Sequence, residues 1–366
     1  MLMFAFVFIF VLILAAISDS SGDRKYDFLC KHLIIILLTL TCAIREESVG
    51  TDTSQYVQYF SIQNFGVIDW ISYGLEPFFG FIVNLLNLLN FKDYFFYFLI
   101  FSYITNFFII KSIFKLNNRF LLLSLYLGFS TLFFYNFNVV RQGVAISIFL
   151  YSIFSLFEGK LLKYSLLTLF ASLFHYSALF NFIFIAIYYL GVFSSICFSV
   201  AVAFLYYLGY TYLIKYVALF SGSDKSIEYI GLLQTGGGKT QFFIILFVVF
   251  ISMVLHFFVR NNNSVKPINN NIVYSLYSFL IVFQFFIAFM GLKYEGPGRI
   301  VSYYYIAYFF MFNNFLLSNK VGARVFYSLI ISMFSLVYVY IFISNGNHEI
   351  LPFKINPSVL NFFDVF

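Results

Sequence analysis

The sequence predicts an all-α, polytopic integral membrane protein with about 11–12 transmembrane helices. The first supporting observation is composition. Of the 366 residues, 62% are apolar and only 10% are charged, and the mean hydropathy is +0.92. A soluble globular chain is about 25% charged, and no soluble core could bury this much Phe, Leu and Ile. We therefore expect a single transmembrane domain over residues 1–366, with the bilayer as its solvent.

The second observation is a series of apolar runs, most of them near the roughly 20 residues that cross a bilayer as a helix. The predicted spans are 2–18, 28–44, 94–114, 120–137, 141–157, 163–175, 177–192, 196–214, 241–259, 271–291, 300–317 and 325–343. The first run lacks a preceding basic segment, so we interpret it as an uncleaved span with its N-terminus outside. A further apolar run, 77–91, is only 15 residues long, and we expect an interfacial or re-entrant helix there.

Charged residues in the connections predict which side of the membrane each connection faces. The connections 19–27, 115–119 and 158–162 are basic, and their cations are Arg24, Lys25, Lys115, Arg119 and Lys160. By the positive-inside rule these connections are cytoplasmic. The segment 45–93 then lies outside. It is acidic, with Glu46, Glu47, Asp52, Asp69, Glu76 and Asp93 against Arg45 and Lys92.

One run leaves the sidedness of the later connections open. Residues 163–192 could form two short spans or one tilted helix of about 45 Å, against a hydrocarbon core of about 30 Å. We favour two spans, with the break at His175-Tyr176-Ser177. With two spans, the connections outside the membrane are 215–240 and 292–299, and those inside are 260–270 and 318–324. With a single helix, each of these connections lies on the opposite side.

Two ionisable residues stand in otherwise uncharged, membrane-grade sequence. Arg141 begins one predicted span and His175 ends another. An Arg at the centre of a membrane helix costs roughly 2.5–3.5 kcal/mol on insertion scales, so such residues are usually functional. The two spans join at a turn containing Lys160, which comes 19 residues after Arg141 and 15 before His175. At 1.5 Å per residue, both side chains lie about 22–28 Å above that turn, in the outer half of the membrane.

The chemistry of these side chains suits a lipid substrate that carries phosphate. The planar guanidinium of Arg binds phosphate oxygens, and His can shuttle a proton near neutral pH. The alternatives are that Arg141 snorkels to lipid headgroups and that His175 makes a structural bond between helices. Asp52 and Glu76 are further candidate bases or sugar-hydroxyl acceptors, or else ordinary loop residues. Arg299, which precedes a late span, is a second boundary cation or a snorkelling anchor.

Several kinds of site are not expected. Thr235 to Thr240 (TGGGKT) imitates the end of a phosphate-binding loop, but position 233 is Leu where that motif requires Gly. We therefore expect a flexible loop within the second loop, 215–240. The three Cys residues form no metal-spaced pair, and we expect no metal and no cofactor. The net charge of +6 comes mostly from loop residues that hold topology, so we expect no nucleic-acid partner.

Five motifs occur in order along the chain. They are Gly50-x-Asp52-x-x-x-Tyr56, Glu76-Pro77-x-Phe79, Arg141-Gln142-x-x-Ala145, Phe174-His175-x-Ser177-Ala178, and Arg299 ahead of a Tyr-rich span. Over residues 50–355 this order resembles the EpsG-type branch of the bacterial polysaccharide polymerases, the Wzy-like O-antigen and capsule polymerases. The sequence Leu351-Pro352-Phe353-Lys354 also resembles the C-terminal signature of that branch, although the third residue there is often Tyr.

The resemblance implies a metal-independent glycosyltransferase at the outer, periplasmic face of the bacterial inner membrane. Such an enzyme moves the growing glycan from undecaprenyl pyrophosphate onto a new undecaprenyl-pyrophosphate-linked repeat unit, for O-antigen or capsule. Arg141 and Arg299 then bind the donor pyrophosphate and stabilise its leaving charge. One of His175, Asp52 and Glu76 accepts the proton of the attacking hydroxyl. We also expect the substrate to be lined by Gln142, Tyr56, Tyr176 and Ser177. Expected partners are membrane lipid and a flippase and chain-length regulator of the same pathway.

Three other functions compete with this one. An O-antigen ligase has a similar number of spans, but its dominant outer loop usually lies between late spans, whereas here the longest outer stretch is early, at 45–93. A flippase of lipid-linked oligosaccharide shares the lipid and the internal Arg, but we find none of the repeated halves that transporters often show. A membrane acyltransferase also pairs a membrane His with polar partners. Its acyl donor is expected from the cytoplasm, however, whereas the candidate residues here lie in the outer half of the membrane. We rank the polymerase first, the ligase second and the flippase third.

Overall fold

The structure is a computed structural model, and the residues that it describes are helical apart from turns, short connections and one isolated bridge. They are residues 2–62, 65–91, 93–128, 132–221, 239, 241–247, 270–292, 297–316, 321–344, 346 and 349–364. Within them, six helices are long and apolar enough to cross a membrane. These are α1 (Leu2–Ser21), α2 (Arg24–Ala43), α6 (Tyr94–Ile113), α8 (Val140–Phe157), most of α11 (Val192–Ser221) and α14 (Asn270–Phe289). The predicted class, an all-α multi-pass membrane protein, is confirmed.

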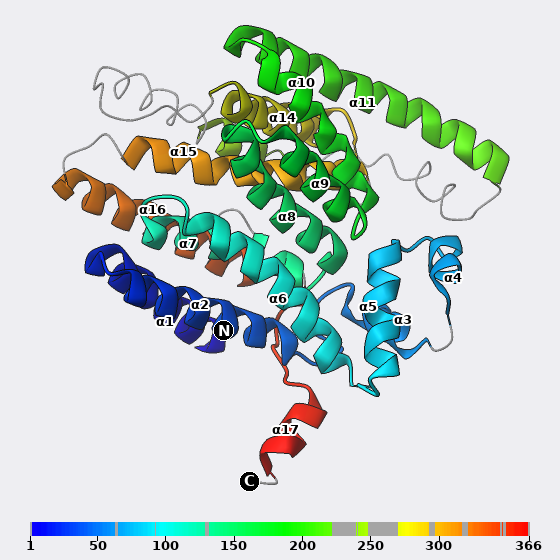
Figure 1. Ribbon diagram of the computed structural model, residues 1–366, viewed down its shortest axis with the longest axis vertical. Coiled ribbons are helices and arrows are strands. Elements are labelled where there is room, and N and C mark those ends of the chain that lie inside the picture. The colour runs from blue at the N-terminus through cyan, green and yellow to red at the C-terminus, as the bar shows by residue number, and fades with distance from the viewer. Residues whose placement is uncertain are drawn as a thin grey trace. The chain divides into compact units, whose positions relative to one another are not determined.

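The chain divides into two compact units, whose α-helices are labelled in Figure 1. The first comprises Met1–Phe182 and Lys320–Phe366, and the second Ile183–Asn319. Further elements of the first unit are α3 (Thr53–Ser61), α4 (Val67–Ser72), α5 (Pro77–Leu88), α7 (Arg119–Leu127), the 3-10 helix η1 (Leu132–Asn136), α9 (Leu161–Ser172), the 3-10 helix η2 (Tyr176–Phe182), α16 (Val321–Ser344) and α17 (Pro357–Asp364). Those of the second are α10 (Ile183–Tyr189), the 3-10 helix η3 (Pro297–Ile306) and α15 (Ala307–Leu316).

Helix α8 forms the centre of the first unit. In its most apolar stretch 83% of the residues are buried, compared with 39% in α1. Helix α8 packs against α6 and α9, α6 packs against α2, and α1 packs against α2 and α7. A helix that is apolar on all sides belongs at such a centre. Residues on α8 are therefore held by the most tightly enclosed element of this unit.

Polar residues at the N-termini fix where two of the long helices begin. Asp23 accepts a hydrogen bond from the Lys25 backbone N–H at 2.8 Å at the start of α2. Asp93 does the same for Phe95 at 2.7 Å at the start of α6. These bonds satisfy N–H groups that the first helical turn leaves unpaired. Gly22, with φ of +61°, makes the tight turn between α1 and α2 at no steric cost.

Three predicted spans in the described part of the chain are not single α-helices, and one of them, 177–192, contains η2 and then α10. The run 120–137 contains α7 and then η1, and the run 300–317 contains the end of η3 and then α15. In the first case the break lies at Gly128, which a neighbouring helix approaches closely. A Cβ atom at Gly128 would lie 2.3 Å from the Ser335 hydroxyl and 2.5 Å from its carbonyl oxygen. The sequence pattern shows only that the run is apolar, not that α16 presses against its middle.

The run 163–192 is broken at His175, in agreement with the two-span interpretation. Helix α9 ends just before this residue and η2 begins just after it. The Tyr164 hydroxyl, near the start of α9, donates a hydrogen bond of 2.6 Å to the backbone oxygen of Asn181, near the end of η2. Helix η2 therefore runs back along α9, and the chain reverses direction at His175.

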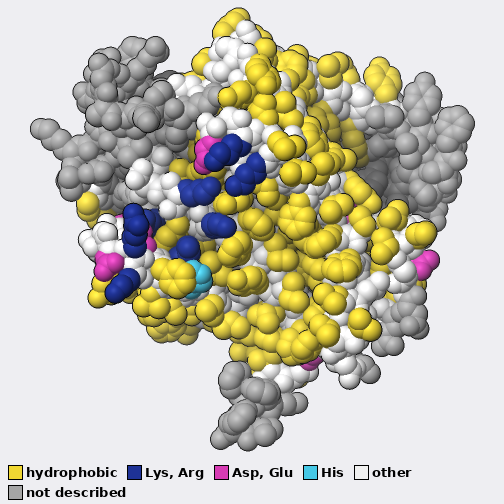
Figure 2. All heavy atoms as spheres, viewed as in Figure 1, with side chains coloured by type: hydrophobic (Ala, Val, Ile, Leu, Met, Phe, Trp, Pro, Cys, Tyr) yellow, Lys and Arg dark blue, Asp and Glu magenta, His cyan; other side chains and the backbone are white. Residues whose placement is uncertain are grey.

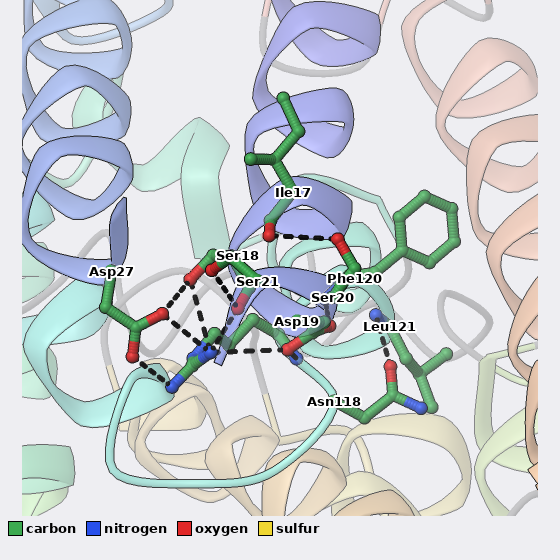
Figure 3. Close-up of polar contacts among 10 residues, drawn as sticks. Ile17, Ser18, Asp19, Ser20, Ser21, Asp27, Asn118, Phe120 and Leu121 are labelled. Carbon is green, nitrogen blue, oxygen red and sulfur yellow. Dashed lines mark hydrogen bonds and ion pairs between the residues drawn. The ribbon is translucent and has the colours of Figure 1, made fainter. Parts of the chain in front are cut away.

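The first two connections predicted to be cytoplasmic lie together in the first unit. Arg119, at the start of α7, donates from Nη2 and Nη1 to the Asp27 carboxylate of α2 at 2.8 and 3.1 Å. Asp19, at the end of α1, accepts from the backbone N–H groups of Arg119 and Phe120 at 3.0 and 2.9 Å. Figure 3 shows these contacts, with Asp19 and Asp27 directed at the same small region from two helices. One Arg thus ties the α1–α2 turn to the α6–α7 turn.

The third predicted cytoplasmic connection, 158–162, lies at the same end of the first unit. Lys115, just after α6, lies over the rings of Tyr151 and Phe154 near the end of α8, with its Nζ 4.4 and 4.9 Å from their centroids, so the α8–α9 turn lies beside the α6–α7 turn. We call this end of the first unit, defined by Arg119, Lys115, Lys160 and Glu158, the basic end. Figure 2 shows Lys and Arg side chains gathered in one region of a largely hydrophobic face. Such clustering is what the positive-inside rule expects of one membrane side.

The segment 45–93 contains more structure than the sequence predicted. A helix, α5, does occur in the run 77–91 where we predicted an interfacial or re-entrant one, and α3 and α4 also occur in this segment. The start of this segment is held by the C-terminal part of the chain. The Glu46 N–H donates to Lys354 O at 2.9 Å, and the Asn356 N–H donates to Ile44 O at 2.8 Å. The segment with the C-terminal signature therefore pairs with the residues that follow α2.

Some predicted features fall outside the described residues. They are most of the second loop 215–240 with its TGGGKT sequence, the span 241–259 beyond residue 247, and most of the connection 260–270. Helix α11 continues to Ser221, beyond the predicted end of its span at 214.

Candidate functional site

Glu76 is placed by the start of α5. It is the N-cap residue of that helix and is followed by Pro77, whose ring favours the first helical position. Its side chain makes no capping bond to the helix. The Phe78 N–H donates to the backbone oxygen of Leu173 at 3.1 Å, which fixes the start of α5 against the end of α9. The carboxylate of Glu76 is thus free of a helix-capping role and is brought beside His175.

Two cation-forming side chains converge on the carboxylate of Glu76. Arg141, in the first turn of α8, donates from Nη1 to Glu76 Oε2. His175 Nδ1 lies 2.6 Å from Glu76 Oε1. The Arg141 guanidinium also lies over the ring of Phe79, 5.6 Å from its centroid, within the range of a cation–π interaction. We call Glu76, Arg141 and His175 the triad.

Exposure differs sharply within the triad. The side chain of Glu76 is 3% exposed, whereas those of Arg141 and His175 are 20% and 28% exposed. Burying an unpaired carboxylate costs several kcal/mol, and pairing offsets that cost. The two outer members remain accessible to a ligand, while the buried carboxylate holds both in place.

The charge state of Glu76 determines what His175 can do. Burial raises the pKa of Glu76, but the hydrogen bond from His175 and the charge of Arg141 outweigh burial and hold this pKa below its usual value. The carboxylate is therefore ionised near neutral pH, and an ionised carboxylate only accepts hydrogen bonds. His175 consequently donates from Nδ1, and in the neutral ring the Nε2 atom is the one that can accept a proton.

Two more predicted residues lie beside the triad on α3. Tyr56 is buried, and its hydroxyl is in hydrogen-bonding reach of Arg141. Burial raises the pKa of Tyr56, and the positive charge of Arg141 opposes that change. Asp52 occupies the N-cap position of α3 without a side-chain capping bond, is half-buried, and acts electrostatically on both Tyr56 and Tyr59.

The other predicted site residues fall into three positions. Gln142 is buried on α8 next to Arg141, at 3% exposure. Tyr176 and Ser177 begin η2, directly after His175, and Tyr176 is exposed. Arg299 is half-buried in η3 and belongs to the second unit, whereas all the others belong to the first.

Sequence reasoning missed the part played by Arg45, which it treated only as a counter-charge in an acidic segment. Arg45 is fully buried, with its guanidinium 3.6 Å from the centroid of the Phe98 ring. Its Nε donates to the Thr53 hydroxyl at 3.2 Å, and that hydroxyl lies 3.1 Å from the backbone oxygen of Phe137. This cluster holds the chain just before α8, so it positions the turn that carries Arg141.

Gly50 of the first motif belongs to the same cluster. Its φ is +99°, and a Cβ atom there would lie 2.7 Å from Phe137 O and 2.8 Å from Thr53 Oγ1. Only Gly fits both the backbone conformation and the space. The signal for this cluster in the sequence was the Gly at the start of the motif, whereas its packing against Phe137 depends on the folded chain.

Comparison with known proteins identifies the family. The sequence model described as the EpsG family matches residues 28–355, which is most of the chain. The chain belongs to the EpsG family. Its members are membrane proteins of polysaccharide biosynthesis, in agreement with the helices described above. No curated protein and no solved structure matches the chain.

The EpsG match spans every residue discussed as part of the site, from Arg45 to Arg299. No group of three or more His, Cys, Asp or Glu side chains that could hold a metal ion occurs among the residues that the structure describes. The arrangement of the triad offers two kinds of chemistry. Arg141 presents positive charge, and His175 presents a nitrogen that can accept a proton, both on the same carboxylate.

Proposed function

We propose that this EpsG-family protein polymerises lipid-linked oligosaccharide repeat units for O-antigen or capsule. It moves the growing glycan from undecaprenyl pyrophosphate onto a new undecaprenyl-pyrophosphate-linked repeat unit. The observation that carries the proposal is the convergence of Arg141 and His175 on the buried carboxylate of Glu76. A phosphate-binding cation and a proton acceptor are the two groups that such a transfer requires.

The position of the triad supports a reaction at the outer face of the bacterial inner membrane. Arg141 lies at the start of α8, a helix of 18 residues, and the basic end lies at its other end. At 1.5 Å per residue the two ends are about 27 Å apart, close to the thickness of the hydrocarbon core. By the positive-inside rule the basic end faces the cytoplasm, so the triad faces the periplasm.

Arg141 is the proposed ligand of the donor pyrophosphate. A cation in the first turn of a helix gains nothing from the helix dipole, which favours anions there. The N-cap residue Val139 offers no side-chain cap, and the buried Nε of Arg141 has no hydrogen-bond partner within the described part of the chain. Arg141 and the start of α8 together attract an anion, and binding strengthens as pyrophosphate takes up negative charge on leaving.

His175 is the proposed base, and Glu76 positions it. The acceptor sugar hydroxyl attacks the anomeric carbon of the donor's reducing-end sugar, and its proton passes to His175 Nε2. The new C–O bond forms as the bond from that carbon to the pyrophosphate breaks, and undecaprenyl pyrophosphate leaves. Glu76 accepts from Nδ1 and stabilises the imidazolium that forms, as the carboxylate of a catalytic triad does. Glu76 is thus a positioning residue in this proposal.

The remaining predicted residues take supporting roles. Asp52 is the second candidate base, and its charge acts on Tyr56 beside Arg141. Arg299 is the proposed second pyrophosphate ligand, on the sequence motif alone. Tyr56, Gln142, Tyr176 and Ser177 are the proposed substrate-lining residues. A flippase delivers the repeat units and a chain-length regulator limits the product, so both are proposed partners.

The test is the surface-glycan banding pattern of the source strain after deletion and restoration of this gene. Deletion is expected to leave glycan carriers that bear a single repeat unit and run as one band. The wild-type gene is expected to restore the ladder of bands from longer glycans. If even the single-unit band disappears, transport or ligation has failed, and the flippase or ligase function replaces this proposal. A ladder that persists after deletion contradicts it outright.

A further inference from the structure

Two tyrosines extend from the triad toward the surface. Phe79, the ring beneath Arg141, lies edge-to-face with Tyr59, with ring centroids 6.2 Å apart. Tyr59 lies edge-to-face with Tyr73 at 6.0 Å, and Tyr73 in turn contacts Phe65 at 5.9 Å. These contacts come from α3, α5 and the residues around α4. They form a continuous aromatic path that begins at the Arg141 guanidinium.

The path becomes more exposed with distance from Arg141. Phe79 is fully buried, Tyr59 is half-buried and Tyr73 is 57% exposed. Burial raises the pKa of Tyr59, and the positive charge of Arg141 opposes that change. The path therefore leads from the Arg141 guanidinium to an exposed tyrosine ring at the surface.

We propose that Tyr59 and Tyr73 bind the reducing-end sugar of the lipid-linked donor. This inference rests on the proposed function, in which Arg141 binds the donor pyrophosphate. That sugar is bonded directly to the pyrophosphate, so it must lie within one ring's width of the phosphate ligand. Along the path, the half-buried ring of Tyr59 is the first beyond Phe79 that reaches the surface, and the exposed ring of Tyr73 lies next to it, 6.0 Å away. Aromatic faces accept the apolar C–H face of a sugar, and phenol hydroxyls bond its hydroxyls.

A different role for exposed tyrosines in a membrane protein is anchoring at the lipid–water interface. The apolar, exposed surface of α4, at Ile68 and Ile71, fits contact with lipid. Anchoring explains the exposure of Tyr73 but not its connection through Tyr59 and Phe79 to Arg141. The two roles differ in what they require: anchoring affects how much protein is inserted, and sugar binding affects the affinity for glycosylated lipid.

The experiment measures binding and turnover of the full-length protein in proteoliposomes. The probes are undecaprenyl pyrophosphate alone and lipid-linked repeat units extracted from the deletion strain. The variants are Tyr59→Ala, Tyr73→Ala, Tyr59→Phe and Tyr73→Phe, with Tyr103→Ala as the matched control, because Tyr103 is 47% exposed on α6. Inserted protein is quantified for each variant, and all values are normalised to it.

Wild type is expected to bind the glycosylated lipid more tightly than bare undecaprenyl pyrophosphate. Each Ala variant is expected to bind the glycosylated lipid about tenfold more weakly and to have a KM for it about tenfold higher, with kcat retained. Its affinity for bare undecaprenyl pyrophosphate is expected to be unchanged. Each Phe variant keeps most of the affinity, because the ring remains, and Tyr103→Ala behaves as wild type. Unchanged affinity in both Ala variants overturns the inference. If wild type binds with this preference but does not polymerise, the proposed function fails while the sugar site stands.

Discussion

The two ends of the first unit both place an Arg against carboxylates, but they arrange them differently. At the basic end, Arg119 donates to Asp27, and Asp19 accepts from the backbone N–H groups of Arg119 and Phe120. At the other end, Arg141 and His175 share the carboxylate of Glu76. The first arrangement satisfies the N-terminus of α7 and ties α1, α2 and α7 together.

The second arrangement links the start of α5 to the start of α8 and to the α9–η2 break, but its side chains satisfy no helix end. Glu76 makes no side-chain bond to its own helix, and Arg141 occupies a helix start where a cation is unfavourable. Charged groups that are held together without serving a helix end are candidates for function. The comparison therefore separates an ion cluster that stabilises the fold from one that the fold maintains for a ligand. Each prediction below tests one side of this distinction.

The largest effect is expected from His175→Ala. Loss of the proposed base should lower the rate of polymerisation by about 10²–10⁴-fold, the usual contribution of general base catalysis. The matched control is His32→Ala, because His32 lies on α2 and contacts its own helix, with Nδ1 at 2.7 Å from Phe28 O. Rates are measured with lipid-linked repeat units at equal amounts of inserted protein. Equal rates for the two variants would show that His175 is structural.

Glu76→Gln should have the next largest effect on the rate. The amide keeps the shape but removes the charge that orients His175 and stabilises its protonated form. We expect a rate at least about 10–100-fold below wild type, the range found when the hydrogen-bond partner that orients a metal-ligating His is lost. A control is Glu158→Gln, an exposed acid at the basic end, which should leave the rate unchanged. A Glu76→Gln enzyme as fast as wild type would contradict the role given to the carboxylate.

Arg119→Ala should affect stability and leave chemistry intact. It removes two charge-assisted hydrogen bonds to Asp27 in a partly buried setting, a loss of about 1–3 kcal/mol. The measurement is the thermal unfolding of the detergent-solubilised protein, together with the rate per folded molecule. A normal melting temperature combined with a lost rate would reverse the distinction between the two ends.

The stability contributed by Glu76 should depend on pH in a defined direction. Its pKa in the folded protein lies below the ordinary value of 4.5, so the unfolded chain binds the proton first as the pH falls. The contribution is fully present above about pH 4.5 and is lost as the pH falls through the lowered pKa. The melting temperatures of wild type and Glu76→Gln should therefore converge below that pH. A gap that widens on acidification would indicate a raised pKa.

The smallest effect is expected from Lys160→Ala. The Lys160 ammonium pairs with Glu158 at 2.6 Å, but both side chains are about half exposed, at 60% and 48%. Exposed ion pairs contribute little. We expect no measurable change in melting temperature or rate. A clear loss of either would show that the basic end does more than hold topology.

Much of this account follows from sequence, and the part that does not has a physical reason. Composition predicted the membrane class, and counting residues from the Lys160 turn placed Arg141 and His175 at similar depth. The partner of both, Glu76, is 65 and 99 residues away from them along the chain, so the pairing arises only on folding. The same holds for the break at Gly128, which depends on contact with Ser335. Patterns of hydrophobicity report burial, not which buried surfaces meet.

The most direct test of the central claim compares Arg141→Ala with Arg119→Ala. Both remove an Arg that bonds to a carboxylate in the first unit, so they differ only in which end is altered. The rate of polymerisation is measured for each in proteoliposomes and divided by the amount of folded protein. We predict that Arg141→Ala loses the rate per folded molecule, and that Arg119→Ala melts lower but keeps its rate per folded molecule. An Arg141→Ala protein that polymerises at the wild-type rate would contradict the account.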